Sequence, residues 1–350
     1  MTNAGGTAGP ESTLYDIARE EMQGLIDRYL TLAEASDGLA TIEAGSIETV
    51  HERRILLAGF GAQDDASMVS ADFVAEEVRR RSAVPFDVER AITTGVYIVL
   101  REKAQGWLNT LSSETEEFTK LDAAYIQAHP AWLPLFMRIA GVFSKAELKR
   151  LIGSATDQRI SAPAAAKLAG LVHDRVTGVN ALTLGEVLRG LEGTLEGIVR
   201  DLVGRLLLES LVEHALKSRG LEFQRETEYK SLTGVVYDIR ADFVLPSAKK
   251  PLAFIEVRKS SSRHASLYAK DKMFSAINWK GKHPDLLGVL VTDGDWTRAT
   301  LEILPRVFDY VVPITNLPVM ADTLKAYVVD KNRSKLKWLI DFAVRANAVS

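Results

Sequence analysis

The 350-residue sequence contains no cysteine. Disulfide bonds, thiolate metal sites and cysteine nucleophiles are therefore excluded, and this composition is typical of a reducing compartment, so we expect a cytoplasmic protein. No apolar run approaches the ~18 residues that a membrane span needs, and the first residues lack the basic and apolar blocks of a signal peptide. We therefore expect no membrane partner, and a disordered tail over residues 1–13.

Several common catalytic motifs are also missing. The chain has no "GK[ST]" phosphate loop and no "GxSxG" nucleophile elbow, and its six histidines show no metal-ligand spacing. The stretch "GFGAQD" at 59–64 resembles part of a dinucleotide fingerprint, but Asp64 stands where the third glycine belongs. The sequence thus predicts neither a nucleotide-binding loop nor a serine hydrolase.

Charge is unevenly distributed along the chain. Residues 1–200 carry a net charge of −8, whereas residues 201–350 carry +5. Within 247–282, nine lysines and arginines accompany only Glu256 and Asp271. A local excess of this sign favours a polyanionic partner, but on the charge run alone we favour a solvated lysine-rich surface.

Residues 14–195 have a helical pattern nearly throughout, with apolar side chains three and four positions apart. The segment "SKAELKRLIG" opens on Ser144 with Glu147 three residues later, which is typical of a capped helix start. Residues 160–191 allow a helix-turn-helix, but we favour an ordinary helical hairpin, because that motif requires a matching groove contact. We predict an all-α domain over 14–195.

The pattern changes after residue 195. A long amphipathic helix ends at Gly220. Strands are then expected over 221–230, 234–245 and 252–259, and the whole order is β-β-β-α-β-α-β-α, with a last helix reaching residue 346. This order predicts an α/β (α+β) fold over 196–350, with a mixed central β-sheet flanked by helices.

The segments "RADFVL" at 240–245 and "LAFIEVRK" at 252–259 form a predicted antiparallel hairpin. If the turn is centred on Lys249, residues whose numbers add to 498 lie opposite each other, so Asp242 faces Glu256 with Cβ atoms about 5 Å apart. Because side chains alternate between faces, Arg258 projects with the two acids. The other face then carries a core-facing set: Phe243, Leu245, Ala253, Ile255 and Val257.

Two opposed carboxylates on one sheet face repel each other. A divalent cation removes this penalty, and Mg²⁺ is typically held by one or two carboxylates together with substrate phosphates. The alternative is a polar sheet face on which Asp242 and Glu256 pair with Arg240 and Arg258. The hairpin alone supports both interpretations.

At these residues the chain resembles the PD-(D/E)xK nuclease superfamily, with Asp242 as the first acid and Glu256 as the acid of "ExK". The helix before the hairpin, and the helix and strand after it, are similar to those of type II restriction endonucleases, so the resemblance covers about residues 196–315. Ala241 replaces the proline of the motif. Arg258 replaces its lysine, and arginine supplies charge and donors but cannot act as a base.

The resemblance implies a catalytic set and a DNA-binding set of residues. Asp242, Glu256 and the Val257 carbonyl are expected to bind Mg²⁺, with Mn²⁺ as a substitute, assisted by Glu209 from the preceding helix. Arg258 takes the lysine position, unless Lys270 or Lys272 reaches the site instead; these two lie about 200° apart on a helix, so at most one of them can face it. The expected DNA contacts are Lys259, Arg263, Lys270 and Lys272.

The sequence therefore predicts a Mg²⁺-dependent, site-specific endonuclease that cuts double-stranded DNA. The family implies a homodimer, which matches palindromic targets, and the helical domain is expected to serve DNA recognition or dimerisation. One alternative is a DNA-binding protein on an inactive nuclease fold, which Arg258 permits. Another is a repair or recombination nuclease. Asp238 is the fallback for the first carboxylate.

Overall fold

The computed structural model describes residues 11–178, 183–260, 265–337 and 339–343. The chain divides into two compact units between Val203 and Gly204. The predicted division at 195/196 instead falls inside a continuous helix, because the apolar stripe of that helix continues to Leu202. Within the described ranges, no helix is long and apolar enough to cross a membrane.

The first unit is helical, as predicted. Its helices are α1 (Leu14–Ala35), α2 (Val50–Gly59), α3 (Ala71–Arg80), α4 (Val88–Glu114), α5 (Ala123–Ala128), α6 (Leu133–Ile139), α7 (Lys145–Ile152), α8 (Ala162–Val176) and α9 (Leu184–Leu202). A two-stranded hairpin of β1 (Ala155–Thr156) and β2 (Arg159–Ile160) separates α7 from α8 and was not predicted.

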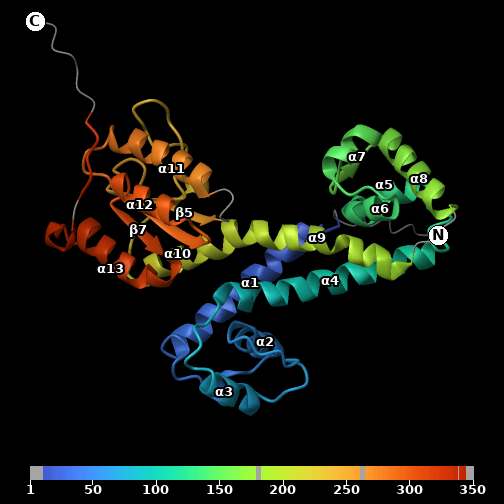
Figure 1. Ribbon diagram of the computed structural model, residues 1–350, viewed down its shortest axis with the longest axis horizontal. Helices are drawn as coiled ribbons and strands as arrows, with labels where there is room; N and C mark the ends of the chain where they lie inside the picture. Colours follow the sequence, from blue (N-terminus) through green and yellow to red (C-terminus); the bar gives the residue numbers. More distant parts are fainter. Residues whose placement is uncertain (1–10, 179–182, 261–264, 338, 344–350) are drawn as a thin grey trace, which may run out of the picture. The chain divides into compact units, whose positions relative to one another are not determined.

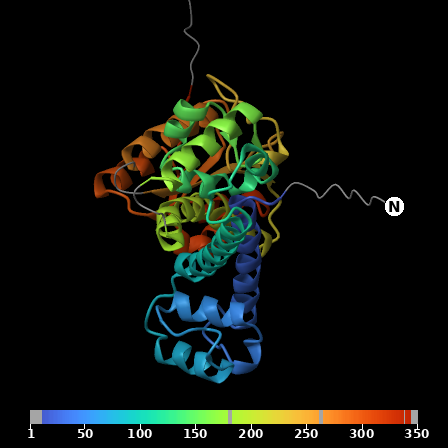
Figure 2. The same ribbon diagram turned by 90° about the vertical axis from the view of Figure 1, so that its right-hand side faces the viewer.

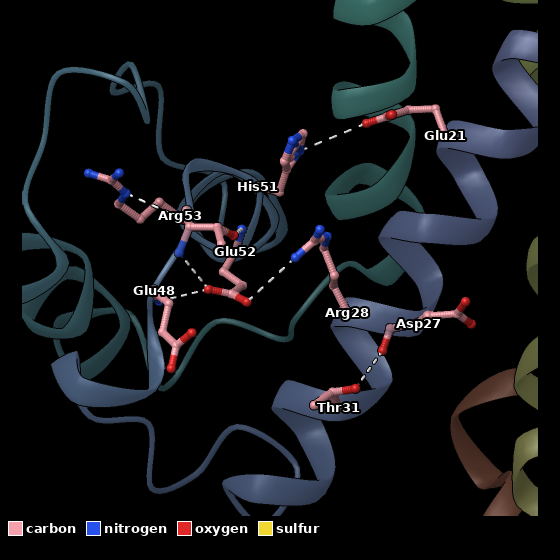
Figure 3. Close-up of polar contacts among 9 residues, drawn as sticks. Glu21, Asp27, Arg28, Thr31, Glu48, His51, Glu52 and Arg53 are labelled. Carbon is pink, nitrogen blue, oxygen red and sulfur yellow. Dashed lines mark hydrogen bonds and ion pairs between the residues drawn. The ribbon is translucent and has the colours of Figure 1, made fainter.

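The long helix α4 packs against α1, α2 and α9, and α2 and α3 form a small group of their own at one end of α1 (Figures 1 and 2). Figure 3 shows how α2 is tied to α1. Glu52 accepts hydrogen bonds from the backbone of Glu48 and Thr49, both 2.7 Å long, and lies 4.0 Å from Arg28 of α1. The Thr49 side chain in turn accepts from the Glu52 backbone, which completes a capping box at the start of α2, and the contact with Arg28 links this end of α2 to α1.

Two local predictions for this unit can be compared with the structure. Ser144 caps α7 by accepting a hydrogen bond from the backbone of Glu147, as the sequence predicts. The helices proposed as a hairpin or helix-turn-helix are α8 and α9. Helix α8 packs against α5, α6 and α7, whereas α9 packs against α1, α4 and α6, so their main packing partners differ.

The second unit has a five-stranded mixed sheet in the order β3-β4-β5-β6-β7, and the predicted succession of elements is confirmed. Strands β3, β4 and β5 are antiparallel, and β5, β6 and β7 are parallel. Its elements are α10 (Leu208–Lys217), β3 (Gln224–Arg225), β4 (Phe243–Leu245), β5 (Ala253–Ser260), α11 (Ala265–Lys280), β6 (Leu287–Gly294), α12 (Arg298–Ile303), β7 (Tyr310–Pro313) and α13 (Leu317–Val328).

Helices cover both faces of this sheet, and in Figure 1 α11 and α12 lie on the side away from α10 and α13. The predicted core-facing set of the hairpin packs with α10 and α13. On the other face, Val244 and Phe254 pack with Trp279 of α11 and Phe308. The alternation of side chains thus buries both faces, as crossover helices require.

Three predicted elements differ from the sequence pattern: two strands are shorter, and the last helix ends earlier. The expected strands over 221–230 and 234–245 are shortened to β3 and β4. Between these two strands, backbone N–H and carbonyl groups form hydrogen bonds with polar side chains instead of with a neighbouring strand. For example, the Asn278 side chain accepts from Val236 N and donates to the Tyr237 carbonyl. Residues 339–343 are not helical, and the Ile340 backbone donates to Asp309 instead.

Candidate active site

The β4–β5 register places the two acidic residues of the hairpin together. Phe243 pairs with Ile255 and Val244 with Phe254, which is the predicted register, and its continuation brings Asp242 opposite Glu256. Both acids are buried, with 7% of Asp242 and 0% of Glu256 exposed. The sheet face that holds them is the one covered by α11.

Asp242 lies directly before β4, where backbone pairing with β5 ends. Its Oδ2 accepts a hydrogen bond from the Val257 backbone N–H at 2.7 Å. The carboxylate thus takes the place of the backbone carbonyl that would accept this hydrogen bond in a longer strand. Part of the reason for an acid at this position is therefore structural.

The Val257 carbonyl points to the same side of β5 as its N–H. The carbonyls of Leu252 and Ser260 bond to Leu287 and Asp295 at the β6 side. Backbone groups alternate in direction along a strand, so odd-numbered residues of β5 address the β4 side. The Val257 carbonyl is thus directed to the Asp242 side, while its side chain is buried in the opposite core.

Glu256 lies in a buried environment with charged neighbours. Its Oε2 lies 2.5 Å from Lys272 Nζ and 3.9 Å from Arg258 Nη2. Its Oε1 is buried and has no hydrogen-bond partner among the described residues. Burial, reinforced by the charge of Asp242, raises the pKa of Glu256 to about 8, although Lys272 and Arg258 act in the opposite sense.

Lys272 rather than Lys270 reaches the carboxylates. Lys272 lies on the buried side of α11 beside Glu256, whereas Lys270 is exposed. This agrees with the expectation that two residues about 200° apart on a helix cannot both face one site. Arg258, which occupies the lysine position of the motif, is farther from Glu256 and 35% exposed.

The remaining predicted residues lie around this centre. Lys259 is on the opposite face and lies 3.8 Å from Asp293. Arg263 falls outside the described residues. Glu209 of α10 pairs with Arg225 at 2.8 Å; burial raises its pKa most, with Asp242 acting in the same direction and Arg225 against it. The fallback acid, Asp238, is exposed and accepts from the Gly234 backbone.

Two residues near the site were not found from the sequence. Arg225 of β3 bonds both Glu209 and Glu213 of α10, each at 2.8 Å. The Tyr229 hydroxyl accepts from the Ala241 N–H at 2.6 Å and donates to the Ala241 carbonyl at 2.7 Å. Both lie in a segment whose pattern predicted one strand, and such a pattern does not indicate side-chain partners.

The donor set suits a hard divalent cation. No group of three histidine, cysteine or acidic side chains that could hold a metal occurs in the ranges that the structure describes. Two carboxylates and a carbonyl nevertheless suffice for Mg²⁺, which keeps several water ligands. The unpartnered Oε1 of Glu256 is a buried acceptor that such an ion would satisfy.

Comparisons of the chain with models of protein families, with curated proteins and with solved structures gave no match in any of the three.

Proposed function

We propose that this chain is a Mg²⁺-dependent endonuclease of the type II restriction kind, which hydrolyses phosphodiester bonds in double-stranded DNA at a specific sequence. One observation carries the proposal. Asp242 and Glu256 lie buried on one sheet face beside Lys272, and Oε1 of Glu256 accepts no hydrogen bond from the residues that the structure describes. An acidic pair with an adjacent ammonium group matches metal-assisted phosphodiester hydrolysis.

Each residue has a role that follows from its position. Asp242, Glu256 and the Val257 carbonyl would hold the metal, which when bound polarises a phosphoryl oxygen and lowers the pKa of its water. Lys272 Nζ, 2.5 Å from Glu256, holds the carboxylate by its charge and can stabilise negative charge developing on the phosphate. Lys272 therefore takes the role of the motif lysine, and Arg258 assists from the exposed side.

Charge supports the proposed substrate, and symmetry supports the proposed oligomeric state. The excess of positive charge within 247–282 suits a polyanion such as DNA. Cutting both strands of a palindromic site calls for two equivalent active sites, so we propose a homodimer. Mn²⁺ is expected to replace Mg²⁺, because both ions favour oxygen ligands.

The test is cleavage of plasmid DNA in the presence of Mg²⁺. Wild-type protein is expected to produce discrete fragments, which the substitution Asp242→Asn should abolish. This variant removes the charge but keeps an oxygen that can accept from Val257 N–H, so loss of activity would not reflect loss of the strand-end hydrogen bond. Glu256→Gln should also abolish cleavage, and Asp271→Asn, at an exposed acid of α11, is the matched control.

The other outcomes are equally informative. Binding of DNA without cleavage in either Mg²⁺ or Mn²⁺ would identify a DNA-binding protein on an inactive nuclease fold. Cleavage that depends on DNA structure rather than on sequence would identify a repair or recombination nuclease. No binding of DNA at all would refute the proposal.

A further inference from the structure

Ala241 lies directly before Asp242, at the position where the nuclease motif has a proline. A proline has no N–H, whereas Ala241 has one, and Ala241 is fully buried. A buried backbone N–H without a partner is strongly unfavourable. The alanine therefore needs a hydrogen-bond acceptor that the proline of the motif would not.

The Tyr229 hydroxyl meets this need and also donates to the carbonyl of the same residue. The two hydrogen bonds are 2.6 Å and 2.7 Å long. The register of β4 with both neighbours ends at Phe243, which pairs with Arg225 of β3 and Ile255 of β5. Beyond it, the Asp242 carbonyl still accepts a hydrogen bond from the Glu226 backbone at 3.0 Å, but the backbone of Ala241 has no strand partner among the described residues. Tyr229 is thus the side chain that fixes the backbone of Ala241, beyond the last paired residue.

Asp242 is the next residue, and its carboxylate reaches β5 at Val257 N. The contacts form a chain: Tyr229 holds Ala241, Ala241 leads into Asp242, and Asp242 accepts from Val257. A shift of the Ala241 backbone would move the Asp242 carboxylate relative to Glu256, because Ala241 and Asp242 share a peptide bond whose carbonyl is held by Tyr229.

We propose that Tyr229 is a positioning residue that holds Asp242 in place for metal binding. The metal-related part of this inference rests on the proposed function. The positioning of Asp242 rests only on the hydrogen bonds of Tyr229 with Ala241 and of Asp242 with Val257. The hydroxyl donates its single proton to the Ala241 carbonyl and accepts from the Ala241 N–H, and burial raises the pKa of Tyr229, so the hydroxyl stays protonated as a donor.

The test compares Tyr229→Phe with Tyr327→Phe. The Tyr327 hydroxyl also makes one short bond to a backbone carbonyl, that of Asp285 at 2.6 Å, so its loss controls for a general loss of stability. In Tyr229→Phe, we expect hydrogen exchange of the Val257 amide to accelerate at least ~10-fold, because its acceptor is no longer held. The Mn²⁺ dissociation constant, measured by titration, should rise roughly 10- to 100-fold, as for other residues that orient metal ligands.

A third measurement separates positioning from catalysis. At saturating Mn²⁺, cleavage by Tyr229→Phe should return to within about threefold of wild type, since added metal compensates for weaker binding. Unchanged Val257 exchange and unchanged Mn²⁺ affinity in Tyr229→Phe would overturn the inference. A wild-type protein that binds no Mn²⁺ would instead overturn the proposed function and the metal-related role, and Val257 exchange would still decide whether Tyr229 positions Asp242.

Discussion

Glu256 should make the stability of the second unit depend on pH. Its carboxyl is fully buried, and its pKa is raised to about 8 by burial and by Asp242. The charged groups that face it are Asp242, Lys272 and Arg258. The perturbation is a change of pH from 5.5 to 8 in metal-free buffer, applied to wild type and to Glu256→Gln.

The sign follows from proton binding. Between pH 4.5 and 8 the folded protein holds the Glu256 proton more firmly than the unfolded chain, in which the pKa is about 4.5. Stability contributed by this group is therefore largest at low pH and falls as the pH rises. For pKa values of 4.5 and about 8, the loss between pH 5.5 and pH 8 is about 3 kcal/mol.

Urea denaturation at several pH values measures this loss. Other titrating groups are common to both proteins, so the difference in unfolding free energy between wild type and Glu256→Gln isolates Glu256. That difference should change by about 3 kcal/mol in favour of the glutamine variant as the pH rises. Saturating Mg²⁺ should reverse the trend for wild type only, because a cation between the acids favours their ionised form.

A constant difference between the two proteins from pH 5.5 to 8 would refute the reasoning. It would mean that Lys272, at 2.5 Å, fully offsets the burial of the Glu256 charge. If the difference in unfolding free energy depends on pH but Mg²⁺ leaves it unchanged, the raised pKa of Glu256 would be supported and the metal site would be contradicted.

Three further predictions concern α11 and its surroundings. Lys272→Met should lower the cleavage rate at least ~100-fold in a plasmid assay, whereas Asp271→Asn, at an exposed position of the same helix, should change it less than about threefold; equal effects would contradict the assignment. Arg258→Ala should reduce cleavage less than ~10-fold, and a loss as large as that of Lys272→Met would return the lysine role to Arg258. Asp309→Asn should destabilise the protein by about 3 kcal/mol in urea denaturation. The reason is that Lys280, 1% exposed and 2.5 Å from Asp309, would be buried without the negative charge that now faces its ammonium group. An unchanged unfolding midpoint would show that the hydrogen bond to the Leu286 carbonyl suffices for the ammonium group.

The hairpin register was predictable because two independent features agree on it. Alternating apolar residues fix which face is buried, and the turn centre fixes which residues oppose each other. Together they placed Asp242 and Glu256 on one face and Val257 in the core, as the structure has them. Local patterns sufficed because all of these residues lie within one hairpin.

The side-chain partners of the site could not be predicted to the same extent. Lys272 was one of two alternatives, because its approach to Glu256 depends on how α11 packs across the sheet, which periodicity does not fix. Tyr229 and Arg225 were missed because their segment resembled a strand, although its backbone groups bond to side chains instead. Long-range polar contacts of this kind leave no periodic signal.

The buried pair of Lys280 and Asp309 anchors the end of the helix that carries Lys272. Lys272 and Lys280 are eight residues apart on α11, about 12 Å along a rigid helix. Asp309 also accepts from the backbones of Gly288 at the start of β6 and Ile340. Release of α11 from this anchor would remove Lys272 from Glu256 and leave two buried acids without a compensating charge. A partly unfolded second unit would therefore lose the proposed activity together with its stability, which ties any phosphodiester hydrolysis to the completed fold.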